Sequence, residues 1–511
     1  MRKLVEFLLK FLSSRIFLVA FILCSQLLLL LTFLFRIGTD SYTLRVIFYT
    51  INIFCALKVI NRYSNTSYKL AWMIIILGLP LVGGITYLMF AERKVPKRLR
   101  GRIIYHLMES RDFFPENQIE IEDEDIRQIY TYLNKNSYYP YYQNTEVEYF
   151  KSGEDFFEDI IKKIRNAKHF IFIEFFIIKK GYMLDRLIEA LRAKIAEGVE
   201  VYMLYDDGGC ITCLPENFES TLKSYGIKVV AFSPVTLRLS LLSKANNRSH
   251  RKIIVIDNEH GFTGGFNLAD EYINKTSPFG YWKDTGVILH GEAVWNLTVM
   301  FIQFYNASVK DQETLNYYDF KINNVVPDKQ SLFLPFSDSP TDTEDLARTV
   351  HLSLINHAKK YIYIHTPYLI LDYDLINALT IAAKSGVEVI ITVPHIPDKK
   401  TVFMVTRSNY QVLLEAGVRI FEYTPGFIHS KMIVVDDKLA LNGTFNMDFR
   451  SYYLNYECGV LIAHDEEILK MRDDYLNTLK ESEEITLEKA KNVNIVVLIL
   501  RSILNVFAPL L

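Results

Sequence analysis

The chain has 511 residues, half of them hydrophobic, with 34 Phe and 32 Tyr and a formal net charge of −2. This length exceeds one ordinary domain, and the apolar composition indicates membrane contact. The charge is uneven, because fifteen Lys or Arg lie in residues 1–102 against three acidic residues. The acidic remainder argues against a nucleic-acid-binding surface spread over the protein.

Three apolar segments lie near the N-terminus, at 16–35, 42–60 and 70–91. At about 1.5 Å per residue, the uncharged first and third segments are long enough to span a hydrocarbon core of ~30 Å. The second contains Arg45 and Lys58 near its ends, so either two or three segments cross the membrane. The basic residues between Arg93 and Arg102 place the rest of the chain on the cytoplasmic side.

Beyond the anchor, strand patterns alternate with helical patterns, which predicts an α/β fold with mostly parallel sheets. The strand pattern at 170–174 recurs at 361–365, and that at 197–201 recurs at 385–389. Such a long period indicates two homologous halves. We expect an anchor with two or three transmembrane segments at 1–100, a connector at 101–145, a first half at 146–310, a linker at 311–343, a second half at 344–485 and a C-terminal helix at 486–511.

Each half contains one histidine motif, and the two motifs have the same spacing. The shared residues are a His, a Lys two positions later, an Asp five positions after the Lys and a downstream Asn: His250, Lys252, Asp257 and Asn267 in the first half, and His429, Lys431, Asp436 and Asn446 in the second. Residues i and i+2 of a strand project to the same side, so each half offers an imidazole together with an ammonium group.

This set of residues suits displacement at a phosphodiester. One histidine can form a covalent phosphoryl intermediate and the other can donate the proton to the leaving alkoxide. Lys252 and Lys431 would supply positive charge, and the amides of Asn267 and Asn446 would bind substrate oxygens. Asp257 and Asp436 belong to the repeated catalytic set, or they pair locally at a strand end.

A further carboxylate recurs in each half, Asp284 before Gly286-Val287 and Glu457 before Gly459-Val460. We expect these two carboxylates to orient the catalytic imidazoles. We expect no metal and no cofactor, because the lysine beside each catalytic histidine would repel a divalent cation. Cys210 and Cys213 form a single Cys-x-x-Cys without a second ligand pair, so a zinc or redox role is disfavoured.

The two His-x-Lys-x4-Asp motifs and the Gly264-Gly265-x-Asn267 tail resemble those of the phospholipase D superfamily, and the whole chain resembles bacterial cardiolipin synthases. The resemblance extends to the stretches 69–72, 80–83, 364–368, 450–451, 455–457 and 508–511. It implies two phospholipase D-like αβ halves that share one active site, preceded by transmembrane helices. One departure is Gly443-Thr444, where the first half has Gly264-Gly265.

The resemblance also implies an activity: a phosphatidyl group passes from one phosphatidylglycerol to another, giving cardiolipin and glycerol. It favours His250 as nucleophile, although the repeat makes the two histidines chemically equivalent. The expected location is the bacterial cell membrane, as a multi-pass protein with its catalytic part on the cytoplasmic side and no nucleic-acid partner. A phospholipase D hydrolase or another phosphatidyltransferase would use the same residues, and the sequence specifies no oligomeric state.

The C-terminal stretch from Val493 to Leu511 has its apolar residues close to one helical face. Two interpretations remain open for it. The helix packs on the catalytic part, or it lies in the headgroup layer of the membrane.

Overall fold

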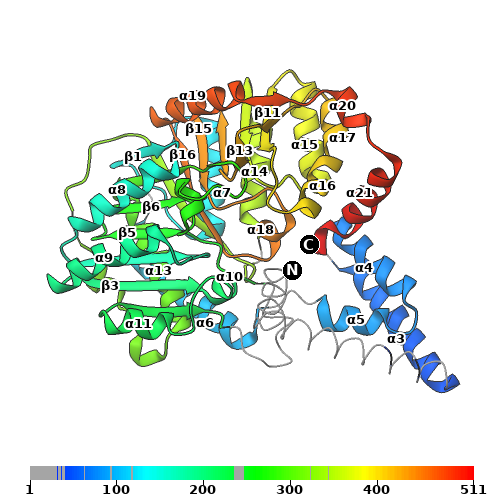
Figure 1. Ribbon diagram of the computed structural model, residues 1–511, viewed down its shortest axis with the longest axis horizontal. Coiled ribbons are helices and arrows are strands. Elements are labelled where there is room, and N and C mark those ends of the chain that lie inside the picture. Colours follow the sequence, from blue (N-terminus) through cyan, green and yellow to red (C-terminus); the bar gives the residue numbers. More distant parts are fainter. Residues whose placement is uncertain are drawn as a thin grey trace, which may run out of the picture. The chain divides into compact units, whose positions relative to one another are not determined.

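The computed structural model describes Thr32, Arg36 and residues 41–62, 64–91, 95–116, 119–234, 247–322, 324–342 and 344–510 (Figure 1). The chain forms two compact units. The first contains the described residues up to Ala91, and the second contains nearly all of the later ones. The expected domain boundaries within the second unit stay predictions.

The first unit contains the helices α3 (Tyr42–Asn61), α4 (Thr66–Gly78) and α5 (Gly83–Phe90). Among the described residues, only α3 is long and apolar enough to cross a membrane. The continuous span expected at 70–91 is not found, because Leu79 to Val82 separate two short helices there. With 13 residues, α4 is only ~20 Å long. The span expected at 16–35 lies almost wholly outside the described residues.

Asn52 of α3 satisfies backbone groups at the break between α4 and α5. Its Nδ2 donates to the carbonyl of Pro80 at 2.6 Å, and its Oδ1 accepts from the N–H of Gly84 at 2.7 Å. Backbone groups in apolar surroundings need such partners. A Cβ at Gly84 would lie 2.5 Å from this Oδ1, so a larger residue there would displace the Asn52 amide.

The first half of the second unit is a seven-stranded sheet in the order β1-β8-β6-β5-β2-β3-β4. Its strands are β1 (Thr145–Phe150), β2 (Phe170–Phe175), β3 (Glu200–Asp206), β4 (Lys228–Phe232), β5 (Ile253–Ile256), β6 (His260–Gly264) and β8 (Gly286–Gly291). The strands β2, β3 and β4 are parallel, whereas β5, β6, β8 and β1 pair antiparallel. The expected mostly parallel sheet is therefore a mixed sheet.

A tight turn explains this difference. Asp257 and Asn258, between β5 and β6, have φ values of 54° and 52°, and Asp436 and Asp437 repeat this with 54° and 60°. Positive φ at both central residues is typical of type I′ hairpin turns, in which Asn and Asp are favoured. The segment after each histidine motif therefore forms a hairpin, where an αβ alternation would predict a crossover.

The second half is an eight-stranded sheet in the order β17-β12-β11-β10-β14-β15-β16-β9. Its strands are β9 (Leu332–Asp338), β10 (Tyr361–His365), β11 (Glu388–Pro394), β12 (Arg419–Tyr423), β14 (Met432–Val435), β15 (Leu439–Gly443), β16 (Glu457–Ala463) and β17 (Ser482–Glu484). Apart from the added β17, the order matches that of the first half. The prediction of two homologous halves is confirmed.

Helices cover both sheets, and a two-stranded ribbon of β7 (Tyr281–Lys283) and β13 (Gly426–Ile428) joins the halves. The first half has α6 (Lys97–Glu109), α8 (Gly153–Arg165), α9 (Tyr182–Ala196), α10 (Asp207–Cys210), α11 (Phe218–Ser224) and α13 (Val294–Ser308), whereas α7 (Glu124–Ser137) packs against β9 of the second sheet. The second has α14 (Leu346–His357), α15 (Tyr373–Lys384), α16 (Lys400–Ser408), α17 (Tyr410–Glu415), α18 (Phe449–Tyr453), α19 (Glu467–Lys480), α20 (Leu487–Lys491) and α21 (Ile495–Phe507).

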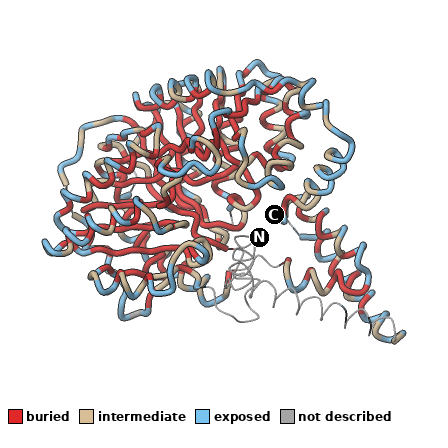
Figure 2. Tube along the Cα trace, in the orientation of Figure 1, coloured by how far each residue is buried: buried red, intermediate tan, exposed pale blue. Residues whose placement is uncertain are grey.

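The hydrophobic core is continuous across the two halves. All residues of α13 from Val294 to Ala307 are buried, against the first sheet and against β9 of the second. Figure 2 shows the strands of both sheets as buried segments within a more exposed layer of helices. The shared core gives the two halves a defined relative position, which the site requires.

Candidate active site

Reciprocal backbone hydrogen bonds between the halves hold the two histidines. The N–H of His250 donates to the carbonyl of Tyr456 at 2.8 Å, and the N–H of His429 donates to the carbonyl of Lys283 at 2.7 Å. Tyr456 and Lys283 each directly precede one of the recurring carboxylates. The backbone therefore places each histidine beside the carboxylate of the opposite half.

The side chains pair in the same crossed way. His250 Nδ1 lies 2.8 Å from Glu457 Oε2, and His429 Nδ1 lies 2.6 Å from Asp284 Oδ2. Both carboxylates are completely buried. An imidazole that donates its Nδ1–H to a carboxylate keeps a lone pair on Nε2, and this is the tautomer a nucleophile or base requires.

The electrostatic environment favours neutral imidazoles and ionised carboxylates. Burial, with a contribution from the neighbouring lysine, lowers the pKa of His250 to about 4 and that of His429 to about 3, although the paired carboxylates act in the opposite direction. Burial raises the pKa of Asp284 and Glu457, but the imidazoles and lysines outweigh it and hold both below their ordinary values. At neutral pH each free Nε2 is therefore available for attack.

The two motif lysines lie against the histidine backbone. Lys252 Nζ donates to the carbonyl of His250 at 2.6 Å, while Lys431 Nζ donates to the carbonyl of His429 and lies 2.8 Å from its Nδ1. Burial lowers the pKa of Lys252 to about 8 and that of Lys431 to about 7. Their positive charge is held in a poorly solvated place, where an anionic substrate group would interact with it strongly.

Aromatic rings surround both imidazoles, and the sequence interpretation missed them. The ring centres of Tyr272 and Trp282 lie 5.3 Å and 5.4 Å from that of His429, and Phe176 lies 5.1 Å from His250. The rings exclude water and restrict imidazole rotation. Trp282 stands two residues before Asp284, so its closeness to a recurring carboxylate was the available signal.

The two motif asparagines differ in their surroundings. Asn267 accepts from the N–H of Ile177 at 3.1 Å and donates to the hydroxyl of Tyr272 at 2.6 Å, so much of its amide is engaged. Asn446 has a buried Oδ1 with no hydrogen-bond partner in the described structure. The expected binding of substrate by both amides stays a prediction, and Asn267 additionally holds Tyr272 against His429.

Asp257 and Asp436 lie away from the imidazoles. The carboxylate of Asp257 accepts three backbone N–H groups at the start of β2, from Lys168, His169 and Phe170. Asp436 accepts the equivalent three at the start of β10. Each Asp lies seven positions after its histidine along largely extended chain, a distance of roughly 20 Å. These contacts support the interpretation in which each Asp pairs locally and holds the strand that follows the helix, and a catalytic role of these two residues stays a prediction.

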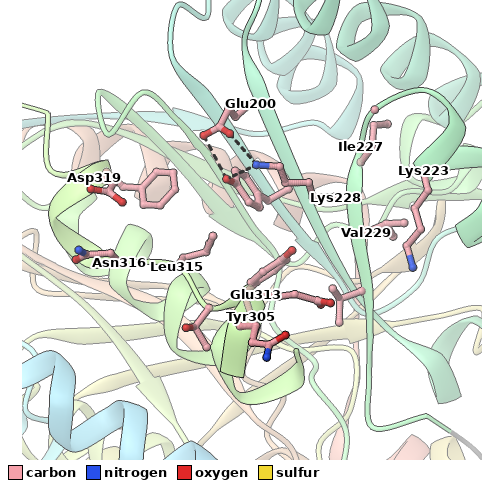
Figure 3. Close-up of a pocket in the computed structure, with 16 residues that line it drawn as sticks. Glu200, Lys223, Ile227, Lys228, Val229, Tyr305, Glu313, Leu315, Asn316 and Asp319 are labelled. Atoms are coloured by element: carbon pink, nitrogen blue, oxygen red, sulfur yellow. Dashed lines mark hydrogen bonds and ion pairs between the residues drawn. The ribbon is translucent and has the colours of Figure 1, made fainter. Parts of the chain in front are cut away.

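The remaining candidate sites do not coincide with the histidines. Glu259, His260 and His290 have ligand atoms within 4.8 Å of one another, at the end of β6 opposite Gly264, and the charge of Lys163 acts on His260. Cys210 is a buried free thiol. A hollow of about 810 Å³ beside β4 is lined by groups that pair with each other, such as Lys228 with Glu200 at 2.7 Å (Figure 3).

Comparison with known proteins adds to this geometry. Residues 160–279 and 351–479 match the family described as "Cardiolipin synthase, PLD-like domain", and residues 50–91 match "Phospholipase_D-nuclease N-terminal". A cardiolipin synthase of Alkalihalophilus pseudofirmus is 34% identical, over 93% of this chain and 94% of the relative. Cardiolipin synthase 1 of Staphylococcus aureus is also 34% identical, over 94% and 99%.

A solved structure shares the fold. The phosphatidylserine synthase of Haemophilus influenzae superimposes with a TM-score of 0.58 at 19% identity, covering 76% of this chain and 98% of that one. Identity over nearly the whole length of the curated relatives, together with the two matched domains, is decisive for the family. The chain belongs to the cardiolipin synthase family of phospholipase D-like phosphatidyltransferases.

Proposed function

We propose that the protein is a cardiolipin synthase that transfers a phosphatidyl group from one phosphatidylglycerol to a hydroxyl of another, giving cardiolipin and glycerol. The observation that carries the proposal is the crossed pairing of His250 with Glu457 and of His429 with Asp284. The pairing offers two activated imidazoles to one phosphodiester, within a chain that shares its family with cardiolipin synthases.

In the first step, Nε2 of His250 attacks phosphorus and a P–N bond forms. The P–O bond to glycerol breaks, and the glycerol alkoxide takes a proton from protonated His429. The pKa of His429 is low in the absence of substrate. A bound phosphodiester anion favours the protonated imidazole and therefore raises this pKa. Lys252 and Lys431 stabilise charge on the non-bridging oxygens as it grows.

In the second step, neutral His429 removes the proton from a hydroxyl of the second phosphatidylglycerol. The oxygen attacks phosphorus, the P–N bond to His250 breaks and cardiolipin forms. The proton that His429 removed leaves it in its protonated form, so the site is ready for another cycle. Two displacements at one phosphorus replace a single difficult one.

The setting proposed for this reaction is the cytoplasmic side of a bacterial cell membrane, with phosphatidylglycerol and cardiolipin as lipid partners and a multi-pass anchor. Support comes from the apolar helix α3 and from the basic residues that come after the first unit. We also propose the expected order of anchor, connector, first half, linker, second half and C-terminal helix, with β9 (Leu332–Asp338) assigned to the second half because it pairs with β16.

Incubation of the purified chain with phosphatidylglycerol labelled in its headgroup glycerol tests the activity. We expect cardiolipin and free glycerol in equal amounts, and neither product from a His250→Gln variant. Phosphatidic acid as the main product would mean that water is the acceptor, as in a phospholipase D hydrolase. A phosphatidyl product that forms only with another added alcohol would indicate a different phosphatidyltransferase.

A further inference from the structure

The C-terminal helix α21 leaves a wide apolar face uncovered. Six large apolar side chains along its 13 residues are exposed by 46 to 65%: Ile495, Val496, Leu498, Ile499, Leu500 and Ile503. No residue of the helix is buried. In Figure 2 this segment, labelled α21 in Figure 1, consists of exposed and half-buried chain. A soluble surface seldom exposes so continuous an apolar patch.

The opposite side of α21 is packed, so the helix has a defined orientation on the second unit. Leu504 and Ala508 join an apolar cluster with Val405 of α16, Phe449 of α18 and Ile370. The side chain of Asn494 begins the helix by accepting the N–H of Val496 at 2.8 Å. The helix therefore packs on the catalytic unit, and its free face is not a consequence of fraying. The two interpretations left open by the sequence are compatible.

This packing connects α21 to the active site. Phe449 begins α18, and the hydroxyl of Ser451 in that helix accepts the backbone N–H of Asn446 at 3.2 Å. The N–H of Ile370 donates to the carbonyl of Met447, the next residue, at 2.8 Å. The apolar face is thus carried by the same cluster that holds the motif asparagine of the second half.

The length and charge of α21 indicate which kind of partner can bind its exposed apolar face. Thirteen residues extend only ~20 Å, which is too short for a hydrocarbon core of ~30 Å, so the helix cannot span it. From Val493 to Leu511 there is no acidic residue, and the one cation is Arg501. Lys399 and Lys400 begin the helix α16 that packs on α21. An apolar helix face that carries a cation and no acidic residue, on a helix packed against another that begins with two lysines, is typical of helices in the plane of an anionic membrane surface.

We propose that the free face of α21 inserts into the headgroup and upper acyl layer of an anionic phospholipid leaflet and holds the active site at that surface. The inference rests on the proposed function, because a two-chain lipid is the substrate that makes such a contact useful. Withdrawing a diacyl lipid into water exposes alkyl chains at about 0.8 kcal/mol per CH₂. An enzyme fixed at the surface avoids most of that cost.

The test compares two triple variants of the full-length chain in phosphatidylglycerol nanodiscs. The first replaces exposed α21 residues: Ile495→Gln, Ile499→Gln and Ile503→Gln. The matched control replaces exposed apolar residues of α15 and α19: Ile381→Gln, Leu469→Gln and Leu476→Gln. We expect the α21 variant to lose roughly ten-fold or more of its activity on long-chain lipid, because each change removes membrane-buried apolar surface. Its activity on short-chain, detergent-dispersed phosphatidylglycerol and its melting temperature should match those of the control.

A second readout does not depend on turnover. A fluorophore attached to Ile499→Cys should be quenched by spin-labelled lipids in the nanodisc, and one attached to Ile381→Cys should not. Absence of quenching at 499, or equal activity loss on both substrates with a lower melting temperature, would overturn the proposal. Cross-linking between position 499 of one chain and position 499 of another would instead assign the face to a second copy. Quenching at 499 without transferase activity on either substrate would refute the proposed function alone.

Discussion

The hydroxyl of Thr444 donates a hydrogen bond to Glu457 Oε2, whereas at Gly265, the equivalent position of the first half, a Cβ would lie 2.1 Å from Asp284 Oδ1. Glu457 also accepts from Asn455 Nδ2 at 3.2 Å. Its charge is therefore shared among more side-chain donors than that of Asp284. Burial and Lys431 nevertheless hold the pKa of His429, about 3, below the value of about 4 for His250, so the preference for His250 as the nucleophile rests on the family resemblance.

Thr444→Val keeps the shape of the side chain and removes this hydroxyl. Without the hydrogen bond the pKa of Glu457 rises, so the acidic limb of the pH profile of kcat/KM should move to higher pH. We expect a loss of about ten-fold at neutral pH, since one hydrogen bond to a charged group contributes ~1.5–3 kcal/mol. Thr444→Ser is the control and should keep the limb in place. An unchanged profile in the valine variant would show that the hydroxyl has no influence on the site.

A substrate whose leaving group needs no proton should distinguish the nucleophile from the general acid. His250→Gln and His429→Gln should each lower phosphatidyl transfer by about 10³-fold or more. With the p-nitrophenyl ester of phosphatidic acid, His429→Gln should still release p-nitrophenolate in a single burst, because this weakly basic leaving group needs no proton. Mass spectrometry should then find phosphate on His250. Phosphate on His429 in a His250 variant would reverse the assignment.

The crossed carboxylates should matter through the tautomer of the histidine they face. Asp284→Asn presents an amide to His429 Nδ1, and an N–H directed at this atom would move the ring proton to Nε2. We expect a loss of about 10²–10⁴-fold in kcat with a small change in KM, as for other carboxylates that orient a catalytic imidazole. Imidazole ¹⁵N shifts would report the changed tautomer at His429 but not at His250. Equal changes at both rings would point to a general loss of structure.

Asp257 and Asp436 should affect stability more than turnover. Asp257→Asn keeps a residue that suits the turn but removes one of the acceptors for the N–H groups of Lys168, His169 and Phe170. We expect a loss of about 1–3 kcal/mol in the free energy of unfolding, measured as a lower melting temperature. Activity per folded molecule should stay within about two-fold. A large loss of activity at an unchanged melting temperature would restore the residue to the catalytic set.

The pH dependence of the reaction should reflect the buried lysines. A lysine carries its charge below its pKa, so kcat/KM should fall as pH rises through the values of about 7 for Lys431 and about 8 for Lys252. A bound phosphodiester favours the charged form, so the limb in kcat should lie at higher pH than that in kcat/KM. Lys431→Arg should be weakly active, yet lack the lower of the two steps. Lys400→Arg, on the surface, should leave the profile unchanged.

The sequence alone determined the elements of this protein that depend on local spacing and on repetition. The two motifs identify His250, Lys252, His429 and Lys431 because their companions recur at matching places. Alternating apolar residues also predict two αβ halves, and the recurrence of Asp284 and Glu457 suggests that both serve the imidazoles. These inferences need only periodicity, which survives in a one-dimensional sequence.

Only the tertiary structure decided which groups meet. The backbone hydrogen bonds from His250 to Tyr456 and from His429 to Lys283 connect the two halves. Each imidazole therefore pairs with the carboxylate of the other half. The repeat cannot reveal this, because pairing within a half would give the same sequence. The break between α4 and α5 depends on Asn52, 28 residues before Pro80, and the role of Asp257 depends on amides more than 80 residues earlier. Contacts of this range follow from chain topology and packing, which local sequence patterns do not specify.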